Sequence, residues 1–345
     1  MNIQHLRKLP AVSKKNHVLG LIDERIASGS QPGAREDGCK LGLVIEGGGM
    51  RGVVTAAMVA ALEQLSLRDA FDVVYGSSAG AISGAYFVAG AARLGTTIFY
   101  ENICNRNFIN TLRFFAKEPV ISLEYLLDFV CETEKPLDWE RVVRSPIKLV
   151  MVASLLTDTD IEPVAIRRVE SKEELKEALR ASSRFPIISG SPVVLRGMRL
   201  IDATVTAFLP CEMAVEDGCT HILVLLSRPR GKTHPKPAFW ERFFSEPLLR
   251  RYHPKLPEVF INRHRRYERL IEGVIRLEDQ AGKRLPHVLS IAADPAATEI
   301  KQLETDRDCL IEGAASGKAA VLEIMGGTAV NVGNIIRELK NSHIC

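Results

Sequence analysis

The sequence lacks paired cysteines, a strong net charge and a recognisable nucleic-acid-binding motif. Seven cysteines occur among 345 residues, at positions 39, 104, 131, 211, 219, 309 and 345. Their odd number and scattered spacing exclude a disulfide framework, and no C-x-x-C pair or Cys/His cluster indicates a zinc site. This use of cysteine is typical of a reducing cytoplasm. The net charge of +3 is too small to indicate a nucleic-acid partner.

Long hydrophobic runs are also scarce. The first 29 residues contain no apolar stretch of seven or more, so we expect no secretory signal. The only long uncharged stretch, Val73 to Ala92, has 20 residues, which is enough to span a bilayer. It contains four glycines and three serines, and this composition favours a buried strand, turn and helix over a membrane span.

Short apolar runs alternate with helical patterns along most of the chain. We predict strands at 41–46, 71–76, 147–156, within 199–205, at 220–227 and at 286–294, and helices at 53–65, from the second strand to about residue 94, at 171–183, at 257–280 and at 306–325. Such alternation predicts an α/β fold of three layers, α/β/α, with a central, mostly parallel sheet and a mainly helical C-terminal extension.

Composition divides the chain into three regions. Residues 1–40 form an N-terminal extension that ends in a polar linker at 28–40, so we expect the compact fold to begin after it. Residues 41–227 form the main α/β domain. Residues 228–345 form a basic, mainly helical region packed on that domain; residues 228–269 alone carry 12 Lys or Arg and 4 Asp or Glu.

Two glycine-rich turns each follow a strand and open a helix. The first, Gly47–Gly52, satisfies G-x-G-x-x-G, which can mark a dinucleotide site at a helix N-terminus. That interpretation requires an acidic residue at the end of the second strand, whereas Asp72 lies at its start. No Gly-Lys-Ser/Thr follows, which argues against a P-loop. A nucleotide-binding module therefore remains the weaker alternative for this turn.

The second turn, Gly76-Ser77-Ser78-Ala79-Gly80, is G-x-S-x-G between a strand and a helix, the context of a nucleophile elbow. Its small neighbours leave the Ser78 hydroxyl free to project. A purely structural role, in which the glycines only let a helix pack close to the sheet, would not explain the serine or the first turn.

Both turns lie at the carboxyl edge of the predicted sheet, where ligands bind. The amides of Gly48, Gly49 and Ala79 could therefore converge on one oxyanion, with Arg51 adding positive charge. A serine nucleophile also needs a base. None of the eight histidines has a suitable context, whereas Asp202 ends a strand and is followed by small residues. Burial would raise its pKa and make it a useful base.

These features resemble the patatin-like phospholipase family. Its Gly-rich oxyanion loop corresponds to Gly47–Gly52, its nucleophile elbow to Gly76–Gly80 and its catalytic aspartate to Asp202, in the family's order. An Ala-Ser-Ser stretch with a following proline corresponds to Ala181–Pro186. The resemblance spans about 41–225, and the overall layout is similar to bacterial members with a C-terminal extension.

The resemblance implies a serine lipid acyl hydrolase with a Ser78–Asp202 dyad, an acyl-enzyme, no histidine and no metal or other cofactor. Ser78 would attack an ester carbonyl, and Asp202 would take its proton and later activate water. The family usually has Asp-Gly-Gly or Asp-Gly-Ala, whereas this chain has Asp202-Ala203-Thr204. Because alanine tolerates fewer backbone conformations than glycine, a catalytically impaired relative is a second alternative.

The expected partner is a lipid or acyl-ester substrate, and the oligomeric state is not indicated. The basic aromatic segment 236–251 has two interpretations. It could contact anionic headgroups at a membrane surface, or it could be an amphipathic helix that covers the core. We therefore expect a cytoplasmic protein with or without peripheral membrane contact.

Overall fold

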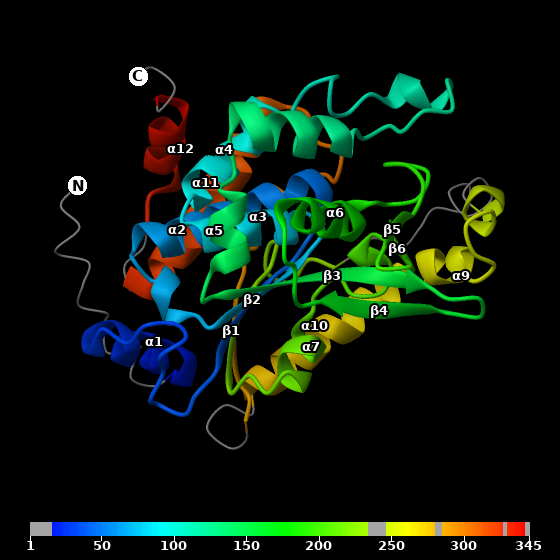
Figure 1. Ribbon diagram of the computed structural model, residues 1–345. Coiled ribbons are helices and arrows are strands. Elements are labelled where there is room, and N and C mark those ends of the chain that lie inside the picture. The colour runs from blue at the N-terminus through cyan, green and yellow to red at the C-terminus, as the bar shows by residue number, and fades with distance from the viewer. Residues whose placement is uncertain (1–15, 234–245, 280–284, 327–329, 342–345) are drawn as a thin grey trace.

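A mixed sheet organises the chain (Figure 1). The computed structural model describes residues 16–233, 246–279, 285–326 and 330–341. Within these residues the sheet has eight strands: β1 Leu41–Ile45, β2 Val73–Ser77, β3 Lys148–Leu156, β4 Ile161–Ile166, β5 Val193–Leu195, β6 Met198–Ile201, β7 His221–Leu225 and β8 His287–Ile291. Their order is β5-β6-β3-β2-β1-β7-β8, and β4 also pairs with β3.

The sheet is mostly parallel, as predicted. Strands β3, β2, β1, β7 and β8 run parallel to one another. The antiparallel pairs are confined to one side, where β3 pairs with β4 and β6, and β6 pairs with β5. These antiparallel strands bring Asp202, which follows β6, to the sheet edge where β2 ends.

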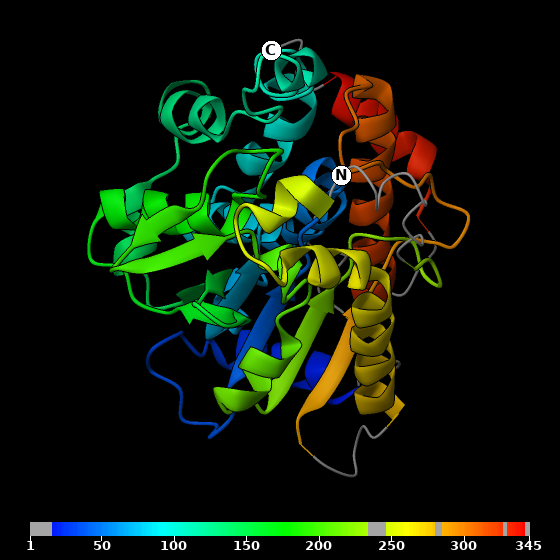
Figure 2. The same ribbon diagram turned by 90° about the vertical axis from the view of Figure 1, so that its right-hand side faces the viewer.

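Helices cover both faces of the sheet (Figures 1 and 2). The described α-helices are α1 His17–Ser28, α2 Gly52–Gln64, α3 Ala79–Ala89, α4 Ala92–Glu101, α5 Trp139–Arg144, α6 Lys172–Ser183, α7 Cys211–Glu216, α9 Leu256–Ile261, α10 Arg263–Asp279, α11 Arg307–Gly326 and α12 Val332–Asn341. Helices α2, α3, α6 and α11 bury apolar residues in the core on one face, and α7 and α10 do so on the other. The three-layer prediction is therefore confirmed.

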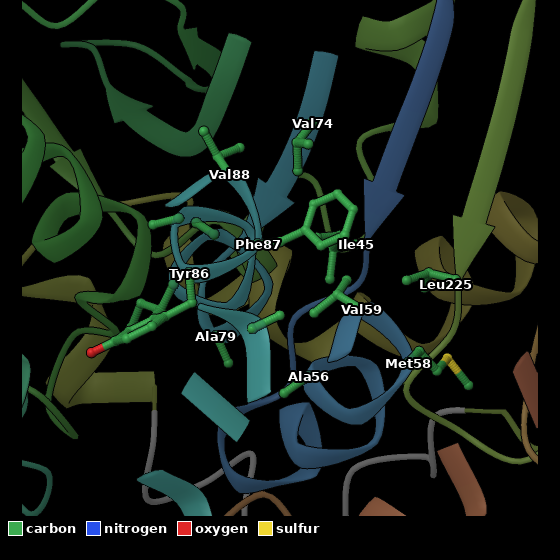
Figure 3. Packing of buried hydrophobic residues seen from close by; sticks show 14 of the residues in the cluster. Ile45, Ala56, Met58, Val59, Val74, Ala79, Tyr86, Phe87, Val88 and Leu225 are labelled. Atoms are coloured by element: carbon green, nitrogen blue, oxygen red, sulfur yellow. The ribbon is translucent and has the colours of Figure 1, made fainter. Parts of the chain in front are cut away.

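The core follows the alternation of side chains along each strand. Leu43 and Ile45 of β1 face the layer of α2 and α3, whereas Val44 between them faces α7 and α10. Figure 3 shows Phe87 of α3 beside Val74 and Ile45 of the sheet. Because α3 is buried along its whole length, its amino end is held firmly at the sheet edge.

The compact fold begins earlier than expected, because α1 packs on the sheet. Val18, Leu19 and Ile22 belong to the main core. Arg25 is fully buried and donates to both Asp37 and Asp72. Helix α1, within the N-terminal extension, therefore adds to a core that we expected to begin after residue 40. The buried positions Val18, Leu19, Leu21 and Ile22 have helical spacing, but the buried charge of Arg25 and the polar linker after it gave no sign that this segment packs on the sheet.

Two predicted helices are each interrupted. The helix expected to reach residue 94 ends at Gly90, whose positive φ of 72° caps α3. The helix expected at 257–280 is broken after α9 at Asn262, and α10 ends at residue 279. The uncharged stretch from residue 73 to 92 thus forms a strand, a turn and a helix. Among the helices that the structure describes, none has the length and apolar character needed to cross a bilayer.

The C-terminal region takes part in the main sheet. Strand β8 pairs in parallel with β7, and α11 packs against α2. Of the segment 236–251, residues 236–245 lie outside the described part of the chain. In the remainder, Leu249 is buried while Arg250 is exposed and paired with Glu246.

Candidate active site

Ser78 occupies a sharp turn between β2 and α3. Its backbone has φ 53° and ψ −122°, a conformation that side chains rarely adopt and that is typical of a nucleophile elbow. A Cβ on Gly80 would lie 2.4 Å from the Ile45 carbonyl oxygen, and one on Gly76 would lie 2.4 Å from the Cα of Ala81. The two flanking glycines are therefore required by close packing of the turn against β1 and against its own helix.

Asp202 reaches this turn because β2 and β6 pair with opposite sides of the same strand, β3, and end at nearby positions along it. The last pairing of β2 with β3 joins Ser77 to Val152. Two residues further along β3, Ser154 pairs with Ile201 at the end of antiparallel β6. Ser78 and Asp202, which directly follow these two strands, consequently meet although they are 124 residues apart.

The two side chains form a hydrogen-bonded pair. Ser78 Oγ donates to Asp202 Oδ2 over 3.0 Å. Ser78 is 7% exposed and Asp202 4% exposed. Burial raises the pKa of Asp202 to about 6, and the hydrogen bonds from Thr204 and Ser78 only partly oppose this increase. At neutral pH the carboxylate is thus ionised, yet it is more basic than an ordinary aspartate.

Neighbouring groups fix the position of Asp202. Its backbone N–H donates to the Arg184 carbonyl, and its carbonyl accepts from Ser154 Oγ. The Thr204 amide and hydroxyl both donate to Oδ1, at 2.7 and 2.5 Å, and leave Oδ2 to Ser78. Ala203 begins a short 3-10 helix and is not among the residues with positive φ. The alanine in Asp202-Ala203-Thr204 therefore causes no backbone strain, and the threonine supplies a donor that glycine or alanine would lack.

The Gly-rich loop is held by Ser227. The Ser227 hydroxyl donates to the Gly47 carbonyl over 3.2 Å. In a planar trans peptide the C=O and N–H point in opposite directions, so the Gly48 N–H points away from Ser227. The Gly48 carbonyl likewise accepts from the Arg51 amide, which turns the Gly49 N–H the other way.

Among the described residues, no hydrogen-bond acceptor is found for the amides of Gly48, Gly49 and Ala79. Gly49 and Ala79 line the same cavity as Ser78. A Cβ on Gly47 would lie 2.2 Å from the Ser77 carbonyl oxygen, so the loop can approach the elbow only with glycine there. The two turns thus meet at one edge of the sheet.

Arg51 lies behind the loop rather than in the cavity. Its side chain is 4% exposed, and Nε donates to Ser227 Oγ over 3.3 Å. Burial lowers its pKa to about 10, with Arg228 acting in the same direction and Glu46 opposing it. The buried Glu46 carboxylate accepts from the Ser227 amide. Arg51 therefore acts through the loop, and Gly52 is the point where α2 contacts Ala79.

A cavity of about 240 Å³ opens in front of Ser78. Ser78, Asp202, Gly49 and Ala79 form one part of its wall, and most of the remaining wall is apolar. The apolar side chains include Ile82, Ile98, Phe99, Phe108, Ile121, Leu126, Phe185, Val205, Phe208 and Phe260. Residues beyond 227 also contribute, since Val259, Phe260, Arg263, Gln302 and Leu303 complete the rim.

Histidine takes no part in this wall. Of the histidines in the described ranges, at positions 17, 221, 253, 264 and 287, none lines the cavity. His221 begins β7 and packs beside His287, which pairs with it across β7 and β8. The pKa of His221 is lowered to about 4, mainly by burial.

Ser182 is a site residue to which the sequence assigned no role. Its hydroxyl accepts the Ser78 backbone N–H over 2.9 Å, so α6 holds the strained elbow from the side. The signal was present in the Ala181-Ser182-Ser183 stretch, but only the fold shows that the first serine faces the nucleophile. Ser182 is thus a positioning residue for Ser78.

We expect Ser182→Ala to lower kcat by roughly 10- to 100-fold, with a smaller change in KM. The variant leaves the buried Ser78 amide without an acceptor, which costs about 1–3 kcal/mol and lets the elbow relax. Steady-state kinetics and thermal unfolding measure both effects. Ser316→Ala removes another buried hydroxyl, on α11 and outside the cavity wall, and should leave kcat unchanged. Equal kinetics for the two variants would contradict the role of Ser182.

Comparison with known proteins gives the family. A family model described as patatin-like phospholipase matches residues 43–215, half of the chain. The chain belongs to the patatin-like phospholipase family. Membership in this family implies a hydrolase, and the matched residues include both glycine-rich turns and Asp202.

A similar curated protein is the uncharacterized protein YjjU of Escherichia coli strain K12. It is 26% identical over 193 residues, which cover 55% of this chain and 52% of YjjU. The match thus spans about half the length of that relative. Like the family model, it leaves part of this patatin-like chain without a counterpart.

Two solved structures are distantly similar to this patatin-like chain. VipD from Legionella pneumophila has a TM-score of 0.41 at 11% identity and covers 84% of this chain and 67% of its own. Human GIVD cytosolic phospholipase A2 has a TM-score of 0.36 at 12% identity and covers 99% of this chain and 64% of its own.

Proposed function

We propose that this protein is a serine lipid acyl hydrolase, which cleaves carboxylic ester bonds through a Ser78–Asp202 dyad. The observation that carries the proposal is the 3.0 Å hydrogen bond from Ser78 Oγ to a buried Asp202 carboxylate at the wall of an apolar cavity. The family match supports a lipid substrate, since patatin-like phospholipases act on lipids.

In the first half of the reaction, Asp202 Oδ2 accepts the Ser78 proton while Oγ attacks the ester carbonyl carbon. The negative charge that develops on the carbonyl oxygen is stabilised by the amides of Gly48, Gly49 and Ala79 and by the amino end of α3. Collapse of the tetrahedral intermediate breaks the bond to the alcohol oxygen. Asp202 returns the proton to that oxygen, and the acyl group stays on Ser78.

In the second half, Asp202 takes a proton from water, whose oxygen attacks the acyl-enzyme carbonyl. The same amides stabilise the second tetrahedral intermediate. Its collapse releases a carboxylic acid and returns the proton to Ser78 Oγ. The apolar wall of the cavity would hold the acyl chain during both halves, because burying its methylenes is favourable.

Hydrolysis of 4-nitrophenyl octanoate by the purified protein, followed from pH 4 to 9, tests this function. We expect steady turnover whose kcat/KM falls below a pH of about 6, because the base must be ionised and burial raises the pKa of Asp202 to about 6. No turnover at any pH, or an acid limb near the ordinary aspartate value of 3.8, would contradict the proposal.

The variant Thr204→Val tests whether Asp202 is the group that titrates in the acid limb of the kcat/KM profile. The variant keeps the shape of the side chain but removes the hydroxyl that donates to Oδ1. Because that hydrogen bond favours the ionised carboxylate, we expect the acid limb of Thr204→Val to move to higher pH. A limb unaffected by this change would indicate that another group titrates.

The nucleotide alternative has less support. A ribose site would need an acidic residue at the end of β2, whereas Asp72 lies just before β2, at the opposite end of the strand. There it accepts hydrogen bonds from Arg25 and Arg35. It is therefore committed to holding α1 and the linker, and the Gly-rich loop faces an apolar cavity instead of a ribose site.

A further inference from the structure

A loop of the described chain exposes large apolar side chains at its tip. Residues 110–120 connect Ile109 to Ile121, which form an antiparallel bridge, and include a short 3-10 helix, Thr111–Phe114. At the tip, Leu112 is 65% exposed, Phe114 48% and Phe115 83%. The loop projects from the body at the upper right of Figure 1. Exposed apolar side chains gathered in this way mark an interaction surface.

The tip has defined local structure. The Asn110 side chain accepts from the Leu112 amide and begins the 3-10 turn. The Glu118 amide donates to the Arg113 carbonyl, which closes the turn, and the rings of Phe114 and Phe115 contact edge to face. At its base the Asn110 amide donates to the Val120 carbonyl. The apolar side chains are thus presented by a structured loop.

The base of the loop belongs to the cavity wall. Phe108 and Ile121 line the cavity of Ser78, and the Ile121 amide donates to the carbonyl of Ile188, another wall residue. A binding partner whose surface contacts the loop tip would therefore lie near the rim of the cavity. In Figure 1 the loop and α9, which supplies Val259 and Phe260 to the wall, both lie on the right-hand side of the molecule.

The charges around the tip indicate what that surface is. Arg106 and Lys117 are exposed and Arg113 is half-buried, and the segment 105–120 contains one carboxylate, Glu118. Within the described residues none of these three cations has a carboxylate partner, and Arg113 donates to the Asn107 carbonyl. Apolar residues flanked by basic ones fit an anionic lipid surface, into which the rings insert while the cations contact headgroups.

We propose that loop 110–120 inserts into the surface of an anionic bilayer and brings the cavity rim to the lipid. This inference rests on the proposed lipid substrate for its biological sense, but the binding itself is independent of hydrolysis. This proposal differs from the expected membrane contact through 236–251, because residues 110–120 include no part of that segment.

Vesicle flotation with the full chain carrying Ser78→Ala tests the proposal without lipid turnover. The probes are vesicles of phosphatidylglycerol and phosphatidylcholine at equal ratio, and vesicles of phosphatidylcholine alone. We expect binding to the anionic vesicles that weakens as salt is raised. Adding Leu112→Glu and Phe115→Glu should weaken this binding at least about tenfold, because two apolar anchors become charged.

Ile275→Glu is the matched control, since Ile275 is an isomer of leucine, is 50% exposed and lies on α10 away from the loop. It should bind vesicles as the parent protein does. In the chain with Ser78 intact, the paired loop substitutions should leave turnover of soluble 4-nitrophenyl butyrate within about twofold, which separates loss of docking from loss of catalysis.

Three results would overturn the proposal. The parent protein could fail to float with anionic vesicles. The paired loop variant could float as fully as Ile275→Glu. Sedimentation without lipid could show a dimer that the loop substitutions dissociate while vesicle binding stays unchanged, in which case the tip contacts a second copy of the chain.

Discussion

Ser78→Ala should lower kcat/KM for ester hydrolysis by at least about 10⁴-fold, because no other hydroxyl can take its place in the strained elbow. The elbow holds the Ser78 hydroxyl within hydrogen-bond distance of Asp202, and Gly49 and Ala79, whose amides we propose as oxyanion donors, line the same cavity. The variant deletes a single oxygen and keeps the backbone of the turn. Hydrolysis of 4-nitrophenyl octanoate, with circular dichroism to check the fold, measures the effect.

The neighbouring serine is the control. Ser77 is also buried, but its hydroxyl donates to the Ala207 carbonyl over 2.6 Å and points away from Asp202. Ser77→Ala should therefore keep activity within about tenfold while losing some stability. A dead Ser77→Ala together with an active Ser78→Ala would reverse the assignment of the nucleophile.

Asp202→Asn should remove nearly all turnover and at the same time stabilise the protein at neutral pH. The amide is close in size and can still accept from Thr204, but it cannot accept the serine proton. We expect a loss of at least about 10³-fold in kcat, as for other enzymes that lose a general base. Kinetics on the purified variant measure the first effect, and urea unfolding the second.

The sign of the stability change follows from the raised pKa. Asp202 binds its proton more tightly when folded, with a pKa of about 6 against an ordinary value of 3.8. Its favourable contribution is therefore complete below a pH of about 3.8 and is lost as the pH rises through 6. Above that range a buried charge opposes folding, so Asp202→Asn should gain about 1–3 kcal/mol at pH 8. The gain should shrink as the pH falls toward 4; a variant that is less stable at pH 8 would contradict this account.

Histidine substitutions separate the dyad from a triad. His221→Gln, His253→Gln, His264→Gln and His287→Gln should each keep substantial activity, because none of these side chains lines the cavity. A folded but inactive histidine variant, combined with an active Asp202→Asn, would replace the dyad by a Ser-His-Asp arrangement.

The parts of the fold that were predictable from sequence are those with strong local signals. The parallel strands are short apolar runs, and β1 and β2 are each followed by a glycine-rich turn. Helix α6 begins where the Ser171 side chain accepts from the Glu174 amide, as the capping-box spacing indicates. Such signals depend only on residues that are close in sequence, so these strands and this helix can be predicted without knowledge of the tertiary structure.

Other features depend on contacts far apart in the chain. The antiparallel position of β6, whose last residue Ile201 pairs with β3 two residues beyond the partner of Ser77, is a property of sheet register and not of composition. Helix α1 is held by the buried Arg25, a residue that sequence patterns assign to the surface. The end of α3 at Gly90 could not be predicted either, because a single glycine in an apolar run is compatible with both a continuous helix and a helix end.

The candidate site shows the same division. Sequence motifs named Ser78, Asp202 and both glycine-rich turns, but the inward turn of Arg51 toward Ser227 and the support of the elbow by Ser182 follow only from packing. Thr204 is a further case. Its identity marked a departure from the family pattern, while its two hydrogen bonds to Asp202 became visible only in the fold.

Intact-protein mass spectrometry after treatment with a fluorophosphonate tests the Ser78–Asp202 dyad most directly. The reagent reacts fastest with a serine oxygen that a neighbouring base activates and an oxyanion site supports. We expect one adduct on the wild-type protein, located at Ser78 by peptide fragmentation. The adduct should be absent from Ser78→Ala and should form at least about 100-fold more slowly on Asp202→Asn. Undiminished labelling of Ser78→Ala, or labelling of Asp202→Asn at the wild-type rate, would contradict the account.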